Sequence, residues 1–332
     1  MKANIFNKKV MLHFSIYIIS WFTVFWQALC TAFNNIAAYN RNICKFIAFT
    51  LSFTISISMP FLTHNSILNA TPLDTIMGLE IGEQAAVPII MYHVLSKNPK
   101  NKWEITPSNF EDDLIYLSKN GFTTVFMQDI IDFVHDGKAL PEKPIVLTFD
   151  DGSYSTVTYM MPLLEQYNMK ASLAIIGKET DKYTKIKNED KRIKRHPHLT
   201  WDDIDMILAS GLIEIICHSY DLHGRNGAGK LLHESESEYK NRFTKDLRAF
   251  DEALKQNTGL FTKSFAYPLG VISKISDDIL KDAGYLASLS CYENTNIITV
   301  GEYECLYKLN RHLRPPRVTS KSFFENKFVL VQ

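Results

Sequence analysis

The stretch PIVLTFDDG, residues 144–152, decides how this chain can fold. It is a short apolar run that ends abruptly in two carboxylates and a glycine, which is the pattern of a buried strand leading into a loop. In folds with parallel strands, chemistry gathers at the carboxyl ends of the strands. Asp150 and Asp151 therefore occupy a position that is typical of a functional site.

These two carboxylates follow each other directly. On a regular strand neighbouring side chains point to opposite faces, but at a strand end the alternation relaxes and Gly152 lets the backbone turn tightly, so Asp150 and Asp151 could face one pocket. Like charges held close together resist joint ionisation unless a cation neutralises one of them. A bound metal ion would supply that cation. The alternative is an Asp-Asp-Gly turn that caps a helix beginning near Ser155.

A second stretch, IEIICHSYDLHG at residues 213–224, is another apolar run that ends in polar residues. His218 and His223 lie five positions apart and straddle the predicted strand end, so they can converge on one ion. Neutral imidazole suits zinc, cobalt, nickel or iron, and one carboxylate would complete a three-ligand set with open positions for water and substrate. A lone His-x4-His pair is a weak signal, but together with the acidic stretch upstream it becomes a strong one.

The segments TFDDG at 148–152 and HSYDLH at 218–223 resemble the first two motifs of the polysaccharide deacetylases (carbohydrate esterase family 4, with the NodB-type homology domain). The resemblance spans residues 87–329. It implies a distorted (β/α)7 barrel, hydrolysis of acetyl groups on a glycan, and a divalent metal. Zn2+ is the first choice for this metal, and Co2+ or Ni2+ are the alternatives.

This resemblance implies roles for polar residues of the two stretches. Asp151, His218 and His223 would hold the metal, which polarises a water molecule and the substrate carbonyl together. Asp150 is left as the general base that takes the proton of the attacking water. The leaving amine must still receive a proton from a general acid.

Two histidines compete for the role of general acid. His93 follows the opening strand, at a strand end where chemistry is expected. The Tyr-His pair to which it belongs is typical of the subgroup that deacetylates poly-β-1,6-N-acetylglucosamine. His312 lies near the place where many family members carry a histidine of their final motif. We favour His93 as the general acid. The structural alternative for His93 is a loop histidine bonded to a carbonyl, and the alternative for His312 is a surface residue before Pro315.

The third motif departs from the commonest family pattern. Residues 265–270 read FAYPLG where many members have Arg-x-Pro, so the arginine that orients the base carboxylate is missing there. The poly-N-acetylglucosamine subgroup also has an aromatic-Pro-x-Gly at this position. Tyr267 could offer its backbone N–H to the oxyanion, and Arg317 could orient Asp150 in place of the missing arginine.

Composition indicates a globular protein with an added membrane segment: 332 residues, 46% of them hydrophobic and 22% charged, with a net charge of zero. A neutral chain has no electrostatic footprint for nucleic acid. The five cysteines include no Cys-x-x-Cys pair, which argues against a disulfide framework or a zinc knuckle. From residue 87 onward short apolar runs alternate with amphipathic segments. This alternation predicts an α/β fold whose parallel sheet is closed or nearly closed into a barrel.

The first 62 residues differ from the rest. Near-continuous apolar runs at 10–28 and 46–62 each approach the length needed to cross a bilayer, and the basic residues before the second run place the chain beyond Leu62 outside the cytoplasm. We expect a membrane anchor of one or two spans at 1–62, a linker at 63–85 and an extracytoplasmic catalytic domain at 86–332. A cleaved signal peptide would instead make the domain secreted, and two buried core helices are a third interpretation.

The sequence therefore predicts a metal-dependent deacetylase of N-acetylated cell-surface or extracellular polysaccharide, which hydrolyses the acetamide of N-acetylglucosamine units to amine and acetate. A catalytically silent glycan-binding protein on the same fold and a deacetylase of O-acetylated glycan are the alternatives. A glycosidase fits poorly, because its two carboxylates flank the sugar several ångströms apart, whereas Asp150 and Asp151 are adjacent. Peptidoglycan, chitin-like oligomers, poly-N-acetylglucosamine and acetylated xylan all remain compatible substrates.

Overall fold

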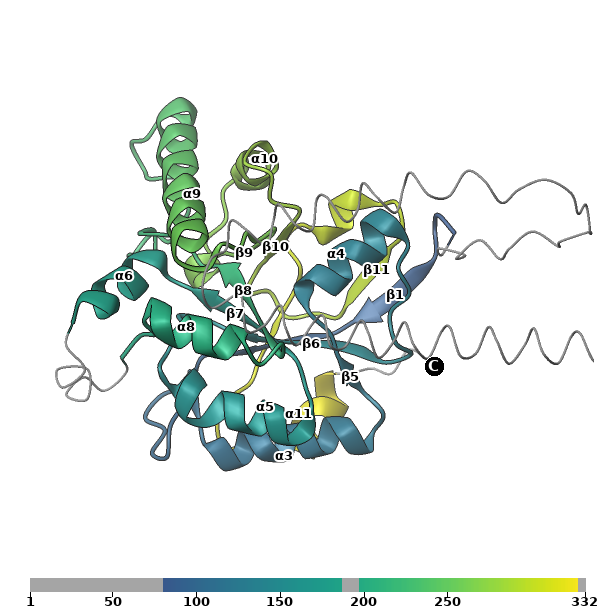
Figure 1. Cartoon of the computed structure of the whole chain (residues 1–332). Helices are drawn as coiled ribbons and strands as arrows, with labels where there is room; N and C mark the ends of the chain where they lie inside the picture. Colours follow the sequence, from purple (N-terminus) through teal and green to yellow (C-terminus); the bar gives the residue numbers. More distant parts are fainter. Residues whose placement is uncertain (1–79, 187–196, 328–332) are drawn as a thin grey trace, which may run out of the picture. The chain divides into compact units, whose positions relative to one another are not determined.

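The computed structural model of the chain (Figure 1) describes residues 80–186 and 197–327. The two apolar runs predicted to be membrane spans, at 10–28 and 46–62, lie outside these ranges. Among the described residues no helix combines the length and the apolar character needed to cross a bilayer. The described part corresponds to the predicted catalytic domain.

A parallel sheet forms the centre of this domain. Within the described residues its strands are β2 (Ile89–Tyr92), β5 (Thr123–Thr124), β6 (Pro144–Phe149), β7 (Ala171–Ile175), β8 (Ile213–Cys217), β9 (Ser264–Ala266), β10 (Ala287–Leu289) and β12 (His312–Leu313). Their spatial order is β10-β9-β8-β7-β6-β2-β12, and β5 pairs with β6 beside this path. All pairings in the sheet are parallel.

The sheet curves into a half-barrel whose edges are linked. At one edge, Leu289 of β10 forms a parallel bridge with Leu309. The Leu309 N–H donates to the carbonyl of Ser288, and the Ser290 N–H donates to the carbonyl of Leu309, both at 2.8 Å. Leu309 leads into β12, which pairs with β2 at the other edge. Residues 309–313 therefore connect the two edges of the sheet.

Two smaller strand pairs flank the sheet. β1 (Gln84–Val87) pairs antiparallel with β11 (Asn296–Thr299), and β3 (Val94–Leu95) pairs parallel with β4 (Glu104–Ile105). Because β1 begins inside the predicted linker at 63–85, the ordered domain begins slightly earlier than the sequence indicates.

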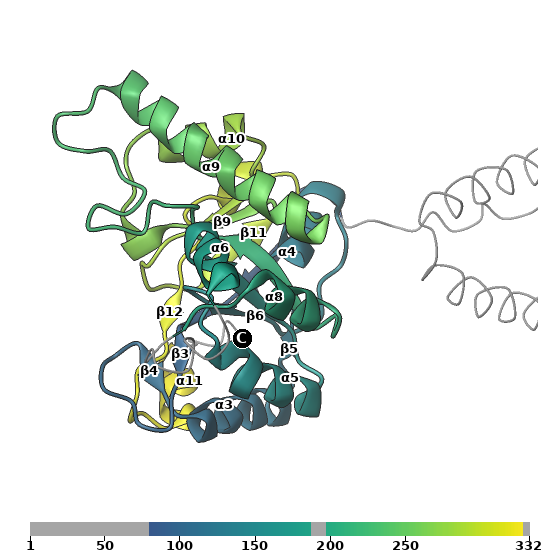
Figure 2. The same ribbon diagram turned by 60° about the vertical axis from the view of Figure 1, so that its left-hand side comes forward.

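Helices lie on both sides of the sheet. The α-helices of the described residues are α3 (Pro107–Lys119), α4 (Met127–Asp136), α5 (Met161–Tyr167), α6 (Gly177–Lys185), α8 (Trp201–Leu208), α9 (Glu236–Thr258), α10 (Ser276–Asp282) and α11 (Ser320–Lys327). In Figure 1 and in the turned view of Figure 2, α3, α5 and α11 lie below the strands and α9 and α10 above them. Residues of these five helices nevertheless belong to one apolar cluster, because they cover the same face of the curved sheet, whereas α4 belongs to the other cluster. A π-helical turn (Thr156–Met160) precedes α5, and 3-10 turns occur at Pro268–Gly270 and Tyr303–Leu306.

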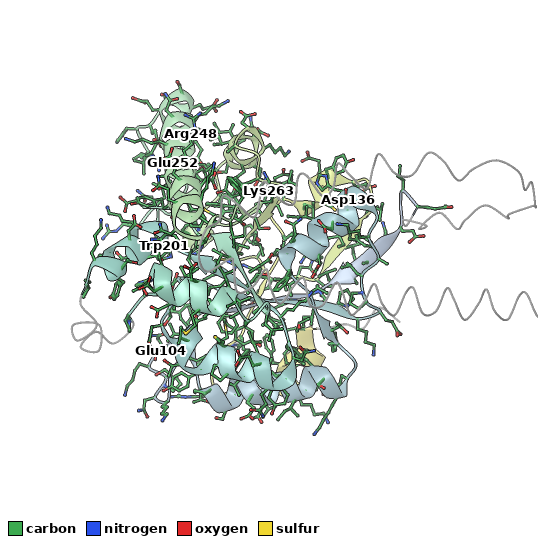
Figure 3. All side chains as sticks on the ribbon, in the orientation of Figure 1. Glu104, Asp136, Trp201, Arg248, Glu252 and Lys263 are labelled. Atoms are coloured by element: carbon green, nitrogen blue, oxygen red, sulfur yellow. The ribbon has the colours of Figure 1, made fainter. Side chains whose placement is uncertain are left out.

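Helix α9 illustrates how the sequence determines a covering helix. Ser235 caps its first turn, and Gly259, with φ 73°, ends it. Arg248 and Glu252 are exposed on its outer side (Figure 3). Its buried apolar residues recur three or four positions apart: Tyr239, Phe243, Leu247, Phe250 and Leu254. The helix therefore turns one apolar stripe toward the rest of the domain.

Alternate residues of β6 belong to two different apolar clusters. Leu147 and Phe149 belong to a cluster that includes residues of α3, α8 and α9, whereas Val146 belongs to one that includes residues of α4. Because side chains of a strand alternate between its faces, Thr148 and Asp150 share the face of Val146. This face leads to the carboxyl end of the strand, where the two carboxylates lie.

The predicted α/β organisation around a parallel sheet is confirmed. Strand β8 coincides with the start of the apolar run that the sequence shows at 213–224. The pattern misses α6, because Gly177 resembles a stop after β7 but is the first residue of the helix. It also misses β12, because a strand of two residues shows no periodicity.

A buried ion pair holds the C-terminal segment to α3. Arg314 donates from Nε to Oδ2 of Asp113 at 2.8 Å and from Nη2 to Oδ1 at 2.9 Å, and neither side chain is exposed to solvent. Tyr92 of β2 donates its hydroxyl to the same carboxylate at 3.0 Å. Removal of one partner of such a pair leaves the other charge buried without compensation.

Replacement of Arg314 by methionine should therefore lower the free energy of unfolding by about 3–5 kcal/mol. Denaturant unfolding of the wild type and the variant measures this difference. The double variant Arg314→Met, Asp113→Leu should regain most of the loss, since it removes both charges. Equal stability of the wild type and Arg314→Met would show that this ion pair does not hold the segment in place.

Candidate active site and metal centre

The chain reverses direction directly after β6. Asp151 and Gly152 both have positive φ, 73° and 68°, which is uncommon for a residue with a side chain. A Cβ atom at Gly152 would lie 3.1 Å from the side chain of Ile175 in β7, and together with the positive φ this close contact favours glycine here. As a result of this turn, Asp150 and Asp151 line the same cavity.

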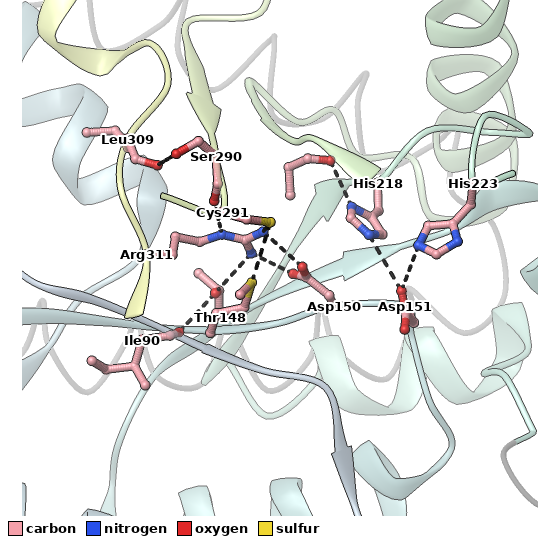
Figure 4. Close-up of polar contacts among 12 residues, drawn as sticks. Ile90, Thr148, Asp150, Asp151, His218, His223, Ser290, Cys291, Leu309 and Arg311 are labelled. Carbon is pink, nitrogen blue, oxygen red and sulfur yellow. Dashed lines mark hydrogen bonds and ion pairs between the residues drawn. The ribbon is translucent and has the colours of Figure 1, made fainter. Parts of the chain in front are cut away.

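Asp151, His218 and His223 form one cluster (Figure 4). Oδ1 of Asp151 lies 3.5 Å from Nε2 of His218 and 3.1 Å from Nε2 of His223. The candidate ligand atoms of the three residues all lie within 4.8 Å of one another. Ser219, with φ 69°, starts the turn between the two histidines. Such a set suits a divalent ion of the zinc type and leaves further coordination positions open.

The surroundings of these residues also fit a metal ion. Nδ1 of His218 donates to the carbonyl of Ala266 at 2.8 Å, so Nε2 is the ring nitrogen on the side of Asp151. Within residues 80–186 and 197–327, Oδ1 of Asp151 is buried and accepts no well-formed hydrogen bond. Burial would raise the pKa of Asp151, but the imidazoles of His218 and His223 hold it well below its usual value. The site thus offers an ionised carboxylate and an oriented imidazole to a cation.

Asp150 is held by an arginine. Arg311 donates from Nη1 to Oδ1 of Asp150 at 2.7 Å and from Nη2 to Oδ2 at 2.9 Å (Figure 4). Arg311 is itself fixed, because Nε donates to the carbonyl of Ser290 at 2.8 Å and Nη1 to the hydroxyl of Thr148 at 3.3 Å. Burial would raise the pKa of Asp150, but Arg311, His218 and His93 together outweigh it and the pKa is lowered. Asp150 is therefore an ionised, oriented carboxylate that is suited to accept a proton.

Arg311 makes the contact with Asp150 that the sequence analysis expected of Arg317. Arg317 is an exposed residue with φ 63° on the turn after two prolines. The expectation that Arg317 orients Asp150 is therefore wrong. Arg311 directly precedes β12, and a strand of two residues gave no pattern from which its inward direction could be inferred.

His93, which follows β2, lies beside the two carboxylates. It lines the same cavity as Asp150 and Asp151, and its ring lies 4.6 Å from the ring of Trp103, centroid to centroid. Among the described residues, its buried Nδ1 has no hydrogen-bond partner. Burial lowers the pKa of His93, although Asp150 and Asp151 act in the opposite direction. The ring of His93 is therefore placed where it can exchange a proton with a group bound in the cavity.

His312 is buried but turned away from the carboxylates. Successive residues of a strand face opposite sides, and Arg311 faces Asp150, so His312 faces away from it. Burial lowers the pKa of His312, and the charges that act on it are those of Lys327 and Glu293. Of the two histidines predicted as general acid, the structure brings His93 to the cavity.

The backbone N–H of Tyr267 is already occupied. It donates to the carbonyl of Leu289 at 3.0 Å, and the phenol donates to Oδ1 of Asp277 at 2.8 Å. The expectation that this N–H stabilises an oxyanion is therefore wrong, because pairing within the sheet uses it. Pro268 has no N–H, so the next amide along the chain is that of Leu269, which lines the cavity.

The carboxylates open into a cavity of about 610 Å³, a volume typical of small-molecule sites. Trp103 and Leu269 contribute apolar walls to it. A second cavity of about 450 Å³ shares Asp151, His198 and His223 with the first. The Asp-His-His cluster therefore borders two neighbouring cavities.

Comparison with known families agrees with this geometry. The family model described as polysaccharide deacetylase matches residues 137–288, which include the carboxylate turn and both histidines of the cluster. Residues 137–288 carry a polysaccharide deacetylase domain. Members of this family are hydrolases that act on carbon–nitrogen bonds other than peptide bonds.

Curated relatives of this deacetylase domain come from two bacteria. Poly-beta-1,6-N-acetyl-D-glucosamine N-deacetylase of Escherichia coli (strain K12) is 28% identical over 200 residues, which cover 54% of this chain and 30% of the relative. The protein YxkH of Bacillus subtilis (strain 168) is 24% identical over 250 residues, which cover 75% of this chain and 79% of YxkH. The chain thus spans less than a third of the Escherichia coli relative.

Solved structures share the fold of this deacetylase domain. The Streptococcus pyogenes deacetylase PplD in complex with acetate aligns with a TM-score of 0.61 at 17% identity and covers 74% of this chain and 100% of that one. IcaB from Ammonifex degensii aligns with a TM-score of 0.58 at 25% identity and covers 75% and 97%. The curved parallel sheet and its helices are therefore common to these proteins.

Arg311→Met should move the acid limb of the kcat/KM profile to higher pH. Arg311 holds the pKa of Asp150 low against burial, so without it the carboxylate would take up a proton at a higher pH and lose its capacity as a base. Deacetylation rates measured across pH for both proteins test this shift. Arg314→Met, which breaks the other buried Arg–Asp pair, should leave the limb in place. If the acid limb of Arg311→Met lies at the same pH as that of the wild type, Arg311 does not control the protonation of the base.

Proposed function

We propose that the deacetylase domain hydrolyses the acetamide groups of an N-acetylglucosamine-containing polysaccharide to amine and acetate. The observation that carries this proposal is an Asp-His-His set beside a separate, arginine-held carboxylate in one cavity. Amide hydrolysis uses these two parts, a Lewis acid for the carbonyl and a base for the water. A silent glycan-binding protein would have no use for either part.

Asp151, His218 and His223 are the residues that would hold the metal, with Zn2+ as first choice and Co2+ or Ni2+ as alternatives. When bound, such an ion polarises a carbonyl and lowers the pKa of water. His218 is prepared for this role because its bond to Ala266 fixes the ring, and Asp151 because its carboxylate is ionised.

The remaining steps belong to side chains of the chain itself. Asp150 accepts the proton of the attacking water, and Arg311 keeps it ionised and aimed while it does so. His93 donates a proton to the leaving amine, so that the carbon–nitrogen bond can break. The backbone N–H of Leu269, at the wall of the cavity, is the candidate donor to the oxyanion.

The proposed polymer is poly-N-acetylglucosamine or a related cell-surface glycan. The name of the Escherichia coli relative supports this choice, as does the resemblance of the Tyr-His pair at His93. Removal of acetyl groups from an O-acetylated glycan is the alternative, because the same residues would serve ester hydrolysis. Adjacent carboxylates with separate partners, Arg311 for Asp150 and histidines for Asp151, do not suit a glycosidase.

We further propose that the domain acts on the outer side of the cytoplasmic membrane and that its sheet is a distorted (β/α)7 barrel. The apolar runs at 10–28 and 46–62 support a membrane anchor; cleavage after the second run would make the domain secreted. The bridge between Leu289 and Leu309, at the sheet's edge, supports the barrel.

Metal-depleted protein should release no acetate from N-acetylglucosamine oligomers, and addition of Zn2+ or Co2+ should restore release. Asp150→Asn should lower kcat by about 10²–10⁴-fold, because the base is lost. His218→Ala should prevent restoration by the metal. The measurement is acetate release by the full chain in detergent, with mono-, di- and pentameric substrates.

Absence of acetate release with every metal, from protein that still binds the oligomers, would contradict the proposal and favour a glycan-binding protein. Release of new reducing ends in place of acetate would favour a glycosidase. Release of acetate from O-acetylated xylan alone would indicate that the substrate is an O-acetylated glycan.

His93→Asn should lower kcat on acetamide substrates by about 10²–10⁴-fold, because the amine cannot leave without a proton. The same variant should retain most of its activity on 4-nitrophenyl acetate, because 4-nitrophenolate leaves without protonation. His312→Asn is the matched control and should affect neither substrate strongly. Equal losses on both substrates would remove His93 from the role of general acid.

A further inference from the structure

Asp151 reaches the metal cluster only through an unfavourable backbone conformation. Its φ of 73° lies in the left-handed region, which only a few per cent of non-glycine residues adopt, although aspartate does so more readily than most. Such a conformation persists only where the surrounding contacts hold it. Gly152 permits the turn, since its own φ of 68° costs a glycine little, but it offers no side chain that could hold Asp151 in place.

Residues 197–199 supply the contacts that hold this turn, and we call them the strut. The strut lies antiparallel to the turn, with a bridge between Ser153 and His198. The Leu199 N–H donates to the carbonyl of Gly152 at 2.9 Å, and the Tyr154 N–H donates to the carbonyl of Pro197 at 2.7 Å. These bonds hold Gly152 and Tyr154, which follow Asp151 along the chain, but they do not bind Asp151 directly.

His198 makes the direct contact with Asp151. Its Nδ1 lies 2.7 Å from the backbone oxygen of Asp151. A carbonyl oxygen can only accept, so Nδ1 carries the hydrogen whether the ring is neutral or charged. The ring also contacts that of Tyr183 in α6, with centroids 5.4 Å apart, and it forms a wall of both cavities beside the metal cluster.

We propose that His198 is a positioning residue for the metal ligand Asp151. Its Nδ1–H fixes the peptide plane after Asp151 and thereby holds the left-handed torsion that aims the carboxylate at His218 and His223. This inference rests on the proposed metal site. Partners of this kind that orient a metal ligand typically contribute about 10- to 100-fold in metal affinity, and His198 does so through the backbone.

The test measures Zn2+ and Co2+ affinity of the metal-depleted full chain by competition with a chelator. His198→Leu keeps much of the ring's volume but has no donor, and it should weaken binding by about 10- to 100-fold. His135→Leu is the matched control, since His135 is a half-buried histidine that stacks on Tyr303 with centroids 4.4 Å apart and lines neither cavity. His135→Leu should bind metal as the wild type does.

Two further variants separate the hydrogen bond from packing. His198→Asn places an amide N–H near the position of Nδ1, whereas His198→Gln carries the same group one carbon farther out. His198→Asn should restore metal affinity to within a few-fold of the wild type, and His198→Gln should not. This pair keeps the test decisive even if His198→Leu fails to fold, because the two amides differ only in where the donor lies.

Wild-type affinity in His198→Leu would overturn the inference, and so would equal affinities in His198→Asn and His198→Gln. A wild-type protein that binds neither metal would instead overturn the proposed function. Normal metal binding without acetate release would contradict the proposed reaction and leave the role of His198 standing. The failures of the two proposals can thus be told apart.

Discussion

Two adjacent carboxylates must stay ionised within one cavity, and the rest of the site depends on this constraint. Neighbouring negative charges raise each other's pKa unless each has a positive partner of its own. The structure divides the partners: Arg311 takes both oxygens of Asp150, and Asp151 turns toward His218 and His223. The left-handed torsion at Asp151 is what separates the two directions. One carboxylate is thereby suited to the proposed role of base and the other to that of metal ligand.

The C-terminal segment contributes more to this division than its length suggests. Arg311 turns inward to Asp150, and Arg314, three positions later, turns to Asp113 on α3. Both guanidinium groups are buried and bound through two nitrogens. The strand β12 between them pairs with β2 and so links the sheet edges. One short segment therefore orients the base and secures the helix layer at the same time.

The sequence indicates those parts of the structure that rest on local pattern. The apolar run of β6, its terminal acids and the histidines after β8 follow from strand chemistry, and the resemblance to a family gave them roles. Residues whose role depends on distant partners could not be inferred. Arg311 meets Asp150 only because β12 pairs with β2, and the amide of Tyr267 is lost to catalysis only because β9 pairs with β10. Neither strand pairing can be inferred from the spacing of residues along the chain.

The pairing of Asp150 with Arg311 joins residues 161 positions apart. During synthesis Asp150 leaves the ribosome before Arg311. A nascent chain therefore carries this carboxylate without its partner until β12 has emerged and paired with β2. Contacts of such long range form late and slow folding. The arrangement around Asp150 is therefore completed by one of the last strands to be made. A chain that ended before β12 would contain the proposed metal ligands but would lack the arginine that orients the proposed base.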